Sequence, residues 1–295
     1  FSERRDLREK AFKSWVARGE GAGERDNRPI VAETVKLRAE KAALLGFESF
    51  AHFKLDNTMA KTPENVAALL NTMWAKARTR ARKEVADLAQ LIVAEGKNHA
   101  VAPWDWRHYS EKARAARYDL NAAEVKPYLQ LEKMIEAAFD TATKLFGVRF
   151  KAHGGVSAYH PDVRVFEVLD AGGKRIAIFL ADYFARPSKH SGAWMSEYQE
   201  QHKLVMDSDA SGTPGKSGQT PIVVNVMNFA KAPAGQPVLI TMDDARTLFH
   251  EFGHALHGML SDVTYPSISG TSVSRDFVEL PSQLYEHWLT VPAVL

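Results

Sequence analysis

The chain has 295 residues, which is enough to bury a large core in one domain or in two. Its charge is almost balanced, with 38 Lys and Arg against 36 Asp and Glu, so we expect no nucleic-acid partner. It contains no run of about 18 apolar residues, so we expect no membrane partner. Because it has no cysteine, disulfides, iron–sulfur clusters and thiolate zinc sites are excluded. Any metal must be held by His, Asp or Glu.

Residues 1–150 are predicted to be a helical region. Apolar residues recur at three- and four-residue spacings between residues 29 and 53, as they do on one face of a helix. Thr62 and Pro63 are typical of a helix start and Gly96 is typical of a stop, so we expect a long helix between them. The stretches "PWDWRHYSEKAR" and "LEKMIEAAFDTATKLFGV" continue the helical pattern.

Residues 151–240 are predicted to contain a small antiparallel β-sheet. The stretch "VRVFEVLDAGGKRIAIFLADYF" holds two strand-like runs that are separated by glycines, which is typical of a β-hairpin. A third strand is expected over residues 221–229. Residues 207–221 are rich in Gly, Ser and Pro, and we expect a flexible loop there.

Residues 241–295 are predicted to form the helices of a zinc site. Thr241 is a typical N-cap, and acidic residues follow it. On a helix, His250 and His254 lie one turn apart, so both imidazoles can reach one ion at the zinc–nitrogen distance of about 2.0–2.1 Å. Glu251 lies at the edge of the same face, too close to His250 to be a comfortable third ligand but well placed as a general base. This H-E-x-x-H pattern is typical of zinc hydrolases.

A further histidine, His257, offers an alternative ligand pair with His254. This pairing would leave His250 without a role, and His257 lies about 10 Å along the helix axis from His250. We therefore expect His257 to be packed in the interior or to orient the ligating imidazoles.

A zinc hydrolase site needs a third protein ligand, and the stretch "SRDFVELPSQLYEHW" offers three carboxylates. Pro281 is best tolerated in the first turn of a helix, which predicts a helix that begins around Asp276 with Glu279 in its opening turn. Glu279 is the favoured ligand. Asp276 and Glu286 compete with it, and their other possible roles are helix capping and orientation of the imidazoles.

Two stretches carry a resemblance to a known family. "FHEFGHALHG" and "SGTSVSRDFVELPSQLYEHW" resemble the M3 family of zinc metallopeptidases, to which thimet oligopeptidase and oligopeptidase A belong. "PWDWRHYSEKAR", "DYFARPSKHSGAWM" and "VNVMNF" agree with it, so the resemblance covers nearly the whole chain. "YHPDVRVFEV" is most similar to the bacterial dipeptidyl carboxypeptidase branch.

The resemblance implies a mainly α zincin-type metallopeptidase with a small sheet beside the zinc helix, within a helical clam-like body. It makes His250, His254 and Glu279 the ligands of one Zn²⁺ ion and Glu251 the base and proton shuttle. Short unstructured peptides are the implied substrates, cleaved by an oligopeptidase or peptidyl-dipeptidase that acts as a monomer.

The ends of the chain favour an internal piece of a longer protein. The first residue is Phe1 rather than Met, and the last residues follow soon after the motif-rich segment. The absence of a signal-peptide pattern indicates a cytoplasmic protein. The family places substrate-binding tyrosine and histidine residues downstream of Leu295, so we expect this piece alone to be inactive.

An alternative from another class is a non-catalytic helical protein that binds peptides and has a structural or vestigial metal site. The presence of Glu251 favours the peptidase, because a structural site has no use for a base beside an open coordination position.

Overall fold

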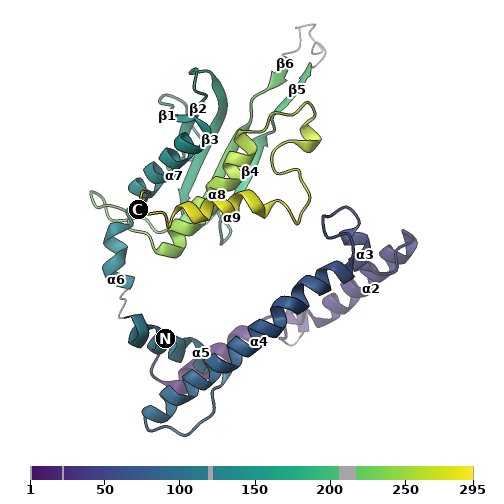
Figure 1. The fold of residues 1–295 in the computed structure, drawn as a ribbon, viewed down its shortest axis with the longest axis vertical. Helices are drawn as coiled ribbons and strands as arrows, with labels where there is room; N and C mark the ends of the chain where they lie inside the picture. The colour runs from purple at the N-terminus through teal and green to yellow at the C-terminus, as the bar shows by residue number, and fades with distance from the viewer. Residues whose placement is uncertain (1, 22, 119–121, 206–216, 295) are drawn as a thin grey trace. The chain divides into compact units, whose positions relative to one another are not determined.

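The computed structural model describes residues 2–21, 23–118, 122–205 and 217–294 (Figure 1). The chain divides into two compact units, Phe1–Asn121 and Ala122–Leu295. The helix that follows residue 130, which the sequence analysis grouped with the helical region 1–150, packs in the second unit. Within the described ranges, no helix has both the length and the apolar character that crossing a membrane requires.

The described part of the first unit is helical, as predicted. Its elements are α1 (Arg5–Val16), a 3₁₀ turn (Gly23–Arg25), α2 (Arg28–Leu44), α3 (Phe50–Leu55), α4 (Pro63–Ala94) and α5 (Pro103–Tyr118). The long helix predicted after Thr62 is confirmed as α4. Thr62 is its N-cap, because its side chain accepts a hydrogen bond of 3.3 Å from the backbone N–H of Asn65. The helix ends just before Gly96, whose φ of 73° favours glycine.

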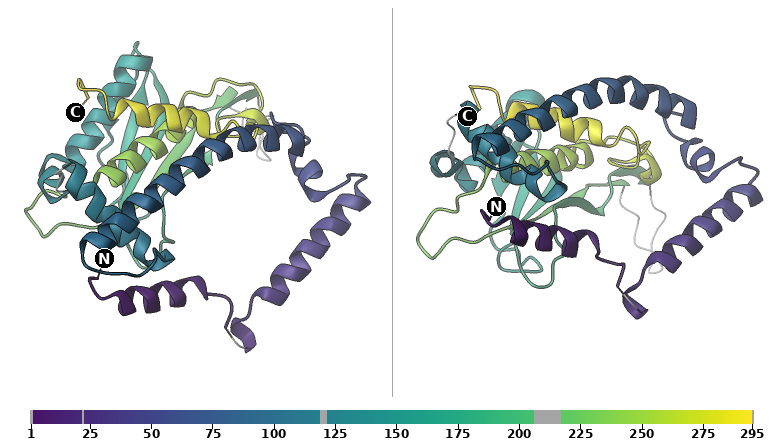
Figure 2. Two further views of the ribbon diagram at one scale, coloured as in Figure 1. Left: turned by 60° about the horizontal axis from the view of Figure 1, so that its bottom comes forward. Right: turned by 90° about the horizontal axis from the view of Figure 1, so that it is seen from below.

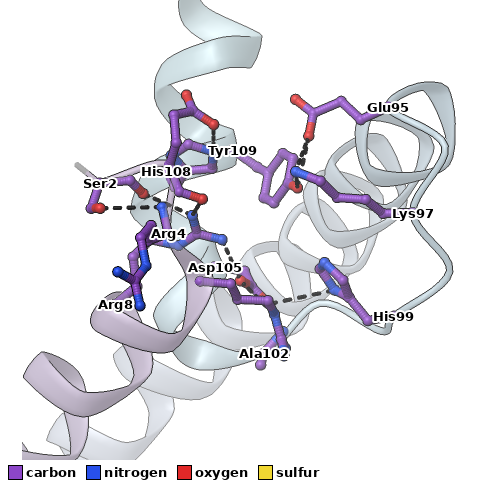
Figure 3. Close-up of polar contacts among 12 residues, drawn as sticks. Ser2, Arg4, Arg8, Glu95, Lys97, His99, Ala102, Asp105, His108 and Tyr109 are labelled. Atoms are coloured by element: carbon purple, nitrogen blue, oxygen red, sulfur yellow. Dashed lines mark hydrogen bonds and ion pairs between the residues drawn. The ribbon is translucent and has the colours of Figure 1, made fainter.

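Two contacts hold the helices of this unit together. α4 packs on α5 through a small buried cluster of Leu88, Ile92 and Tyr109. α1 packs on α5 around Asp105, whose fully buried carboxylate accepts hydrogen bonds from Arg5 and Arg8. Figure 3 shows Asp105 beside Arg8. By contrast, most of α2 is exposed, and Ala42 is its only buried residue among those described.

The second unit contains the predicted sheet. Its helices are α6 (Ala122–Val125), α7 (Leu131–Phe146), α8 (Met242–Met259) and α9 (Glu279–Trp288), with 3₁₀ turns at Lys126–Tyr128 and Pro266–Ile268. Its strands are β1 (Arg149–Ala152), β2 (Arg164–Leu169), β3 (Arg175–Phe184), β4 (Trp194–Gln199), β5 (His202–Val205), β6 (Ser217–Gln219) and β7 (Ile222–Phe229). The hairpin of β2 and β3 and the strand β7 are confirmed.

The main sheet has the order β1-β2-β3-β7-β4, and it is mixed rather than antiparallel. The expectation of a purely antiparallel sheet was wrong at one pair, because β3 and β7 run parallel. The chain leaves β3, forms β4, makes the separate β5–β6 ribbon and then returns as β7 between β3 and β4. Of the loop predicted at 207–221, residues 207–216 lie outside the described ranges, and residues 217–219 form β6.

The largest core of the chain lies between one face of this sheet and the helices α7 and α8 (Figure 1). Alternate residues of β3 point toward it, including Ala177, Phe179 and Tyr183. A smaller cluster around Leu180 and Val224 covers the opposite face. Figure 2 shows α8 and α9 side by side, and their packing is continuous with the core. α8 is thus held on one side by the sheet and on another by α9.

Candidate metal centre

α8 begins where the sequence analysis predicted. The Thr241 side chain accepts a hydrogen bond from the Asp244 backbone N–H, and the Asp244 carboxylate accepts one from the Thr241 N–H in return. This capping box satisfies two backbone donors that the first turn leaves unpaired. Further along the same helix, His250 and His254 lie one turn apart with ring centroids separated by 4.9 Å.

Glu279 comes to these histidines from the first turn of α9. A turn over residues 275–278 precedes the helix, and the N–H of Val278 bonds to the carbonyl of Ser274 there. The helix itself begins at Glu279, three residues later than the Asp276 start that Pro281 suggested. Glu279 therefore lies in the opening turn of this helix, as the sequence pattern predicted, and its side chain contacts α8.

The three side chains converge on one point. Glu279 Oε2 lies 3.2 Å from His250 Nε2 and 3.0 Å from His254 Nε2. One possible ligand atom from each of the three residues lies within 4.8 Å of the other two. Among the described residues, this is the group of His, Asp and Glu side chains that is close enough together to hold a metal ion. Two imidazole nitrogens and one carboxylate oxygen are a donor set that Zn²⁺ binds in catalytic sites.

Glu286 fixes the orientation of one imidazole. Its Oε1 lies 2.7 Å from His250 Nδ1, on the opposite side of the ring from Glu279. A carboxylate at this distance favours the tautomer that carries its proton on Nδ1, which leaves the lone pair of Nε2 facing Glu279. A lone pair and a carboxylate oxygen that face each other need a cation or a shared proton between them. The residues present therefore fit a bound metal ion.

Glu251 follows His250 directly on α8 and is only 7 % exposed. The pKa of its carboxyl is raised to about 6, because burial, the largest cause, and the negative charge of Glu279 raise it more than His250 lowers it. A carboxyl with a pKa near 6 can both accept and release a proton near neutral pH.

The other predicted residues lie outside the cluster. His257 is half-buried, and burial lowers its pKa. It lines an apolar cavity of about 610 Å³ beside α9, together with residues such as Leu256 and Trp288. Asp276 is exposed in the turn before α9. Neither residue is among those whose ligand atoms converge.

Sequence reasoning missed two residues that shape the site. Ser282 is fully buried, and its hydroxyl lies 2.9 Å from the Glu279 carbonyl oxygen and 3.0 Å from Glu279 Oε2. Gly253 lets α9 approach α8, since a Cβ there would lie 2.7 Å from the Ser282 Cα atom. A glycine inside a helix is a signal of close approach and could have indicated this contact.

Comparison with known proteins agrees with this geometry. The chain matches the sequence profile of peptidase family M3 over residues 2–295. The chain belongs to peptidase family M3. M3 peptidases are metallopeptidases, and the convergence of His250, His254 and Glu279 gives this chain a possible metal-binding cluster. The helices and mixed sheet agree with the zincin-type fold that the resemblance implied.

Several M3 peptidases are similar to the chain over nearly all of its length. It is 41% identical to dipeptidyl carboxypeptidase of Escherichia coli (strain K12), and the match covers 100% of this chain and 42% of that protein. It is 36% identical to oligopeptidase A of Salmonella typhimurium, over 100% of this chain and 43% of that protein. Organellar oligopeptidase A of Arabidopsis thaliana is 34% identical, with 97% and 36% covered. The chain thus spans well under half the length of these relatives.

Proposed function

We propose that this chain carries the metal centre of a zinc-dependent peptidase that hydrolyses short peptides. The observation that supports it most directly is the convergence of His250 Nε2, His254 Nε2 and Glu279 Oε2 beside the buried carboxyl of Glu251. Membership of family M3 supports peptide hydrolysis as the reaction. The names of the relatives suggest an oligopeptidase or a dipeptidyl carboxypeptidase.

His250, His254 and Glu279 would hold the ion in this proposal. When bound, zinc supplies a Lewis acid that polarises a peptide carbonyl and makes a water molecule more acidic. The role of Glu286 is to keep the His250 ring turned so that Nε2 faces the ion. The hydroxyl of Ser282 does the same for the Glu279 carboxylate. These two contacts reduce the number of side-chain orientations that the ligands can adopt before the ion arrives.

Glu251 moves the proton. Its ionised carboxylate accepts a proton from the water that attacks the peptide carbonyl carbon. When the C–N bond breaks, the protonated carboxyl gives this proton to the nitrogen of the leaving amine, and Glu251 returns to its starting state. The raised pKa of Glu251 suits both halves of this cycle, because its carboxylate is a stronger base than an ordinary one and its carboxyl still releases a proton near neutral pH.

The sheet offers a surface for an extended peptide. Within the described ranges, β4 is paired with β7 on one side only, so its other edge presents backbone groups that a peptide could bind. β4 also packs against α8. The approach is close at Gly258, where an added Cβ atom would lie only 3.0 Å from Oε1 of Glu197 in β4. Gly258 is about one helical turn beyond His254. A peptide bound along β4 would therefore lie near the metal centre.

The test is the metal content and the peptidase activity of the parent protein that contains this chain. We expect stoichiometric zinc by elemental analysis and chelator-sensitive cleavage of a short blocked peptide. His254→Ala and Glu279→Ala should each reduce both quantities, whereas Asp276→Ala should leave zinc unchanged. Full zinc retention in the Glu279 variant would contradict the proposed ligand set.

A further inference from the structure

The buried side chain of Lys189 lies beside an irregularity in the sheet and takes no part in the proposed metal centre. The ladder between β3 and β7 changes register between Asp182 and Phe184. Residues at such an irregularity leave the regular ladder, and their carbonyl groups need other donors. Lys189, in the connection between β3 and β4, supplies one. Its Nζ donates to the carbonyl oxygens of Asp182 at 3.0 Å, Phe184 at 2.7 Å and Met227 at 2.7 Å.

The ammonium of Lys189 is almost completely removed from water. Its side chain is 4% exposed, and its Nζ also lies 2.8 Å from Asp182 Oδ1. Burial lowers the pKa of Lys189, and the Asp182 carboxylate opposes this shift. A buried ammonium is costly unless it is paired and hydrogen-bonded. Here every proton of the ammonium can find an acceptor, so the contact holds strands and connection together.

The partner of Lys189 is fixed in turn. The fully buried Asp182 carboxylate also accepts two hydrogen bonds of 2.7 Å from the Arg186 guanidinium and one of 2.8 Å from the Tyr159 hydroxyl. A bidentate arginine contact fixes orientation as well as distance. Arg186 and Lys189 both lie in residues 185–193, the connection between β3 and β4. The connection is therefore anchored at two of its positions.

A third contact anchors the end of the connection that leads into β4. The Asn228 side-chain amide donates to the carbonyl oxygens of His190 at 2.8 Å and Gly192 at 2.7 Å. Asn228 lies in β7, one residue after Met227, whose carbonyl binds Lys189. β4 begins two residues after Gly192, and its first residue, Trp194, pairs with Val226. The anchored connection thus ends where the free edge of β4 starts.

We propose that Lys189 is a positioning residue that holds the β4 edge in place for an extended peptide. This inference rests on the proposed function, since it assigns β4 to substrate binding. Lys189 acts through the backbone of residues 185–193 and touches neither the peptide nor the metal ligands. Its loss should loosen β4 and weaken peptide binding, while the chemistry at His250, His254 and Glu251 should continue at its usual rate.

The test compares Lys189→Met with Lys174→Met in the parent protein. Lys174 lies in the exposed turn between β2 and β3, so its replacement controls for the loss of a lysine in the same sheet. We expect Lys189→Met to raise KM for a peptide long enough to lie along β4 by about tenfold, with kcat per bound zinc nearly unchanged. Amide hydrogen exchange should become faster in residues 194–199 and stay unchanged in β1 and β2.

A purely structural role would give a different pattern. General destabilisation would reduce the fraction of folded, zinc-loaded enzyme and leave KM unaltered, so an unchanged KM would overturn the proposal. Unaltered exchange in β4 would overturn it as well. If Lys189→Met does not fold, Asn228→Leu removes a milder contact to the same connection and should show the same KM increase on a smaller scale.

The failure of the proposed function can be recognised separately. A zinc-loaded wild-type parent that cleaves no peptide would overturn the proposed function and the role of β4 in it. The exchange rates of residues 194–199 would then still decide whether Lys189 anchors this strand, because they do not depend on activity.

Discussion

Glu251 illustrates how a single buried carboxyl can be prepared for proton transfer. Its burial raises the pKa to about 6, and the neighbouring Glu279 works in the same direction, while His250 opposes both. A cation held by His250, His254 and Glu279 would add a further positive charge nearby, which favours the ionised form. The base is then ionised when peptide binds, and it can still release its proton to the leaving amine.

Replacement of Glu251 separates catalysis from metal binding. Glu251→Gln should keep zinc, because Glu251 is not one of the converging ligands, but it should lower kcat by about 10²–10⁴-fold because the amide cannot accept the proton. Steady-state kinetics together with elemental analysis checks both parts, with Glu200→Gln as a control at an exposed position. Near-normal turnover in the Gln variant would contradict the role of Glu251 as the base.

Replacement of Glu286 tests the orientation of His250. Glu286→Ala removes the acceptor at 2.7 Å from His250 Nδ1, so the ring loses its fixed orientation. Zinc affinity should fall by about 10–100-fold, as it does when comparable partners of metal-binding histidines are removed. Glu286→Gln, which retains an acceptor oxygen, should lose less. Competition with a chelator of known affinity measures this, and equal losses in both variants would argue against an orienting role.

The sequence predicts the residues of the proposed site better than the residues that support them. The sequence predicts His250, Glu251 and His254 because these chemically active residues follow a fixed spacing along one helix. The sequence does not predict the role of Ser282, since a serine three residues after a glutamate is common. Its hydroxyl supports the site only because α9 turns the Glu279 carboxylate toward α8. The contribution of such a residue depends on tertiary packing, which local sequence does not encode.

At the scale of elements, the contact between α8 and α9 determines where Glu279 lies relative to His250 and His254. Gly253 lies at the closest point, where an added Cβ would also lie 2.9 Å from the Tyr285 Cβ atom. The hydroxyl of the same Tyr285 donates a hydrogen bond of 2.6 Å to the carbonyl of Ala138 in α7. α9 is therefore held between two helices, and any displacement of it moves Glu279.

Gly253→Ala should disturb this contact. The new methyl group meets backbone atoms of α9 rather than a flexible side-chain end, so the helices must separate. We expect a destabilisation of about 1–3 kcal/mol, as is typical when a packed interior is overfilled, together with weaker zinc binding. Thermal unfolding and chelator competition measure the two effects. Gly154→Ala, where nothing lies within 4 Å of the added Cβ, should have little effect on either.

In the first unit, the contact between α1 and α5 depends on the charge of Asp105. Burial alone would raise the pKa of this carboxyl, but the hydrogen bonds from Arg5 and Arg8 outweigh burial and hold the pKa below 3.8. A lowered folded-state pKa stabilises the fold above the unfolded value of 3.8. This contribution is lost as the pH falls through the still lower value of the folded state.

Asp105→Asn should therefore destabilise the protein in a pH-dependent manner. At pH 7 the variant leaves the nearly buried Arg8 without its carboxylate, which should cost about 3 kcal/mol of the free energy of unfolding. The difference between wild type and variant should shrink as the pH is lowered below 3.8. Urea unfolding at several pH values measures this. Asp87→Asn, which breaks a more exposed pair with Arg117, should cost less than about 1 kcal/mol.

The elements of this chain differ in how well their sequences predict them. α4 is readable because its N-cap, first-turn proline and terminal glycine are all local signals. The β2–β3 hairpin is readable from its glycine turn and strand-like runs. The parallel pairing of β3 with β7 is not, since it depends on where the chain inserts a strand after the β5–β6 ribbon. Topology of this kind arises from tertiary packing and has no local sequence signal.

At the scale of the whole molecule, the proposed metal centre belongs to one of the two compact units. α8 and α9, which carry the three converging residues, both lie in Ala122–Leu295. The first unit has a separate small core in Leu88, Ile92 and Tyr109. A ligand that binds only the folded form of one unit stabilises that unit in proportion to its concentration and affinity. Removal of the metal should therefore affect the two units unequally.

This difference can be measured by amide hydrogen exchange in the parent protein before and after treatment with a chelator. At a free zinc concentration of about 100 times the dissociation constant, the bound ion should stabilise its unit by about 2.7 kcal/mol, and this is lost on chelation. Exchange should become faster in residues 242–288, where α8 and α9 lose the ion that links them. Residues 63–118 of α4 and α5 should keep their rates, because these helices pack together through a core cluster of their own. Re-addition of zinc should restore the original exchange rates. If chelation instead made exchange equally faster in both segments, the ion would stabilise both units and the prediction would be wrong.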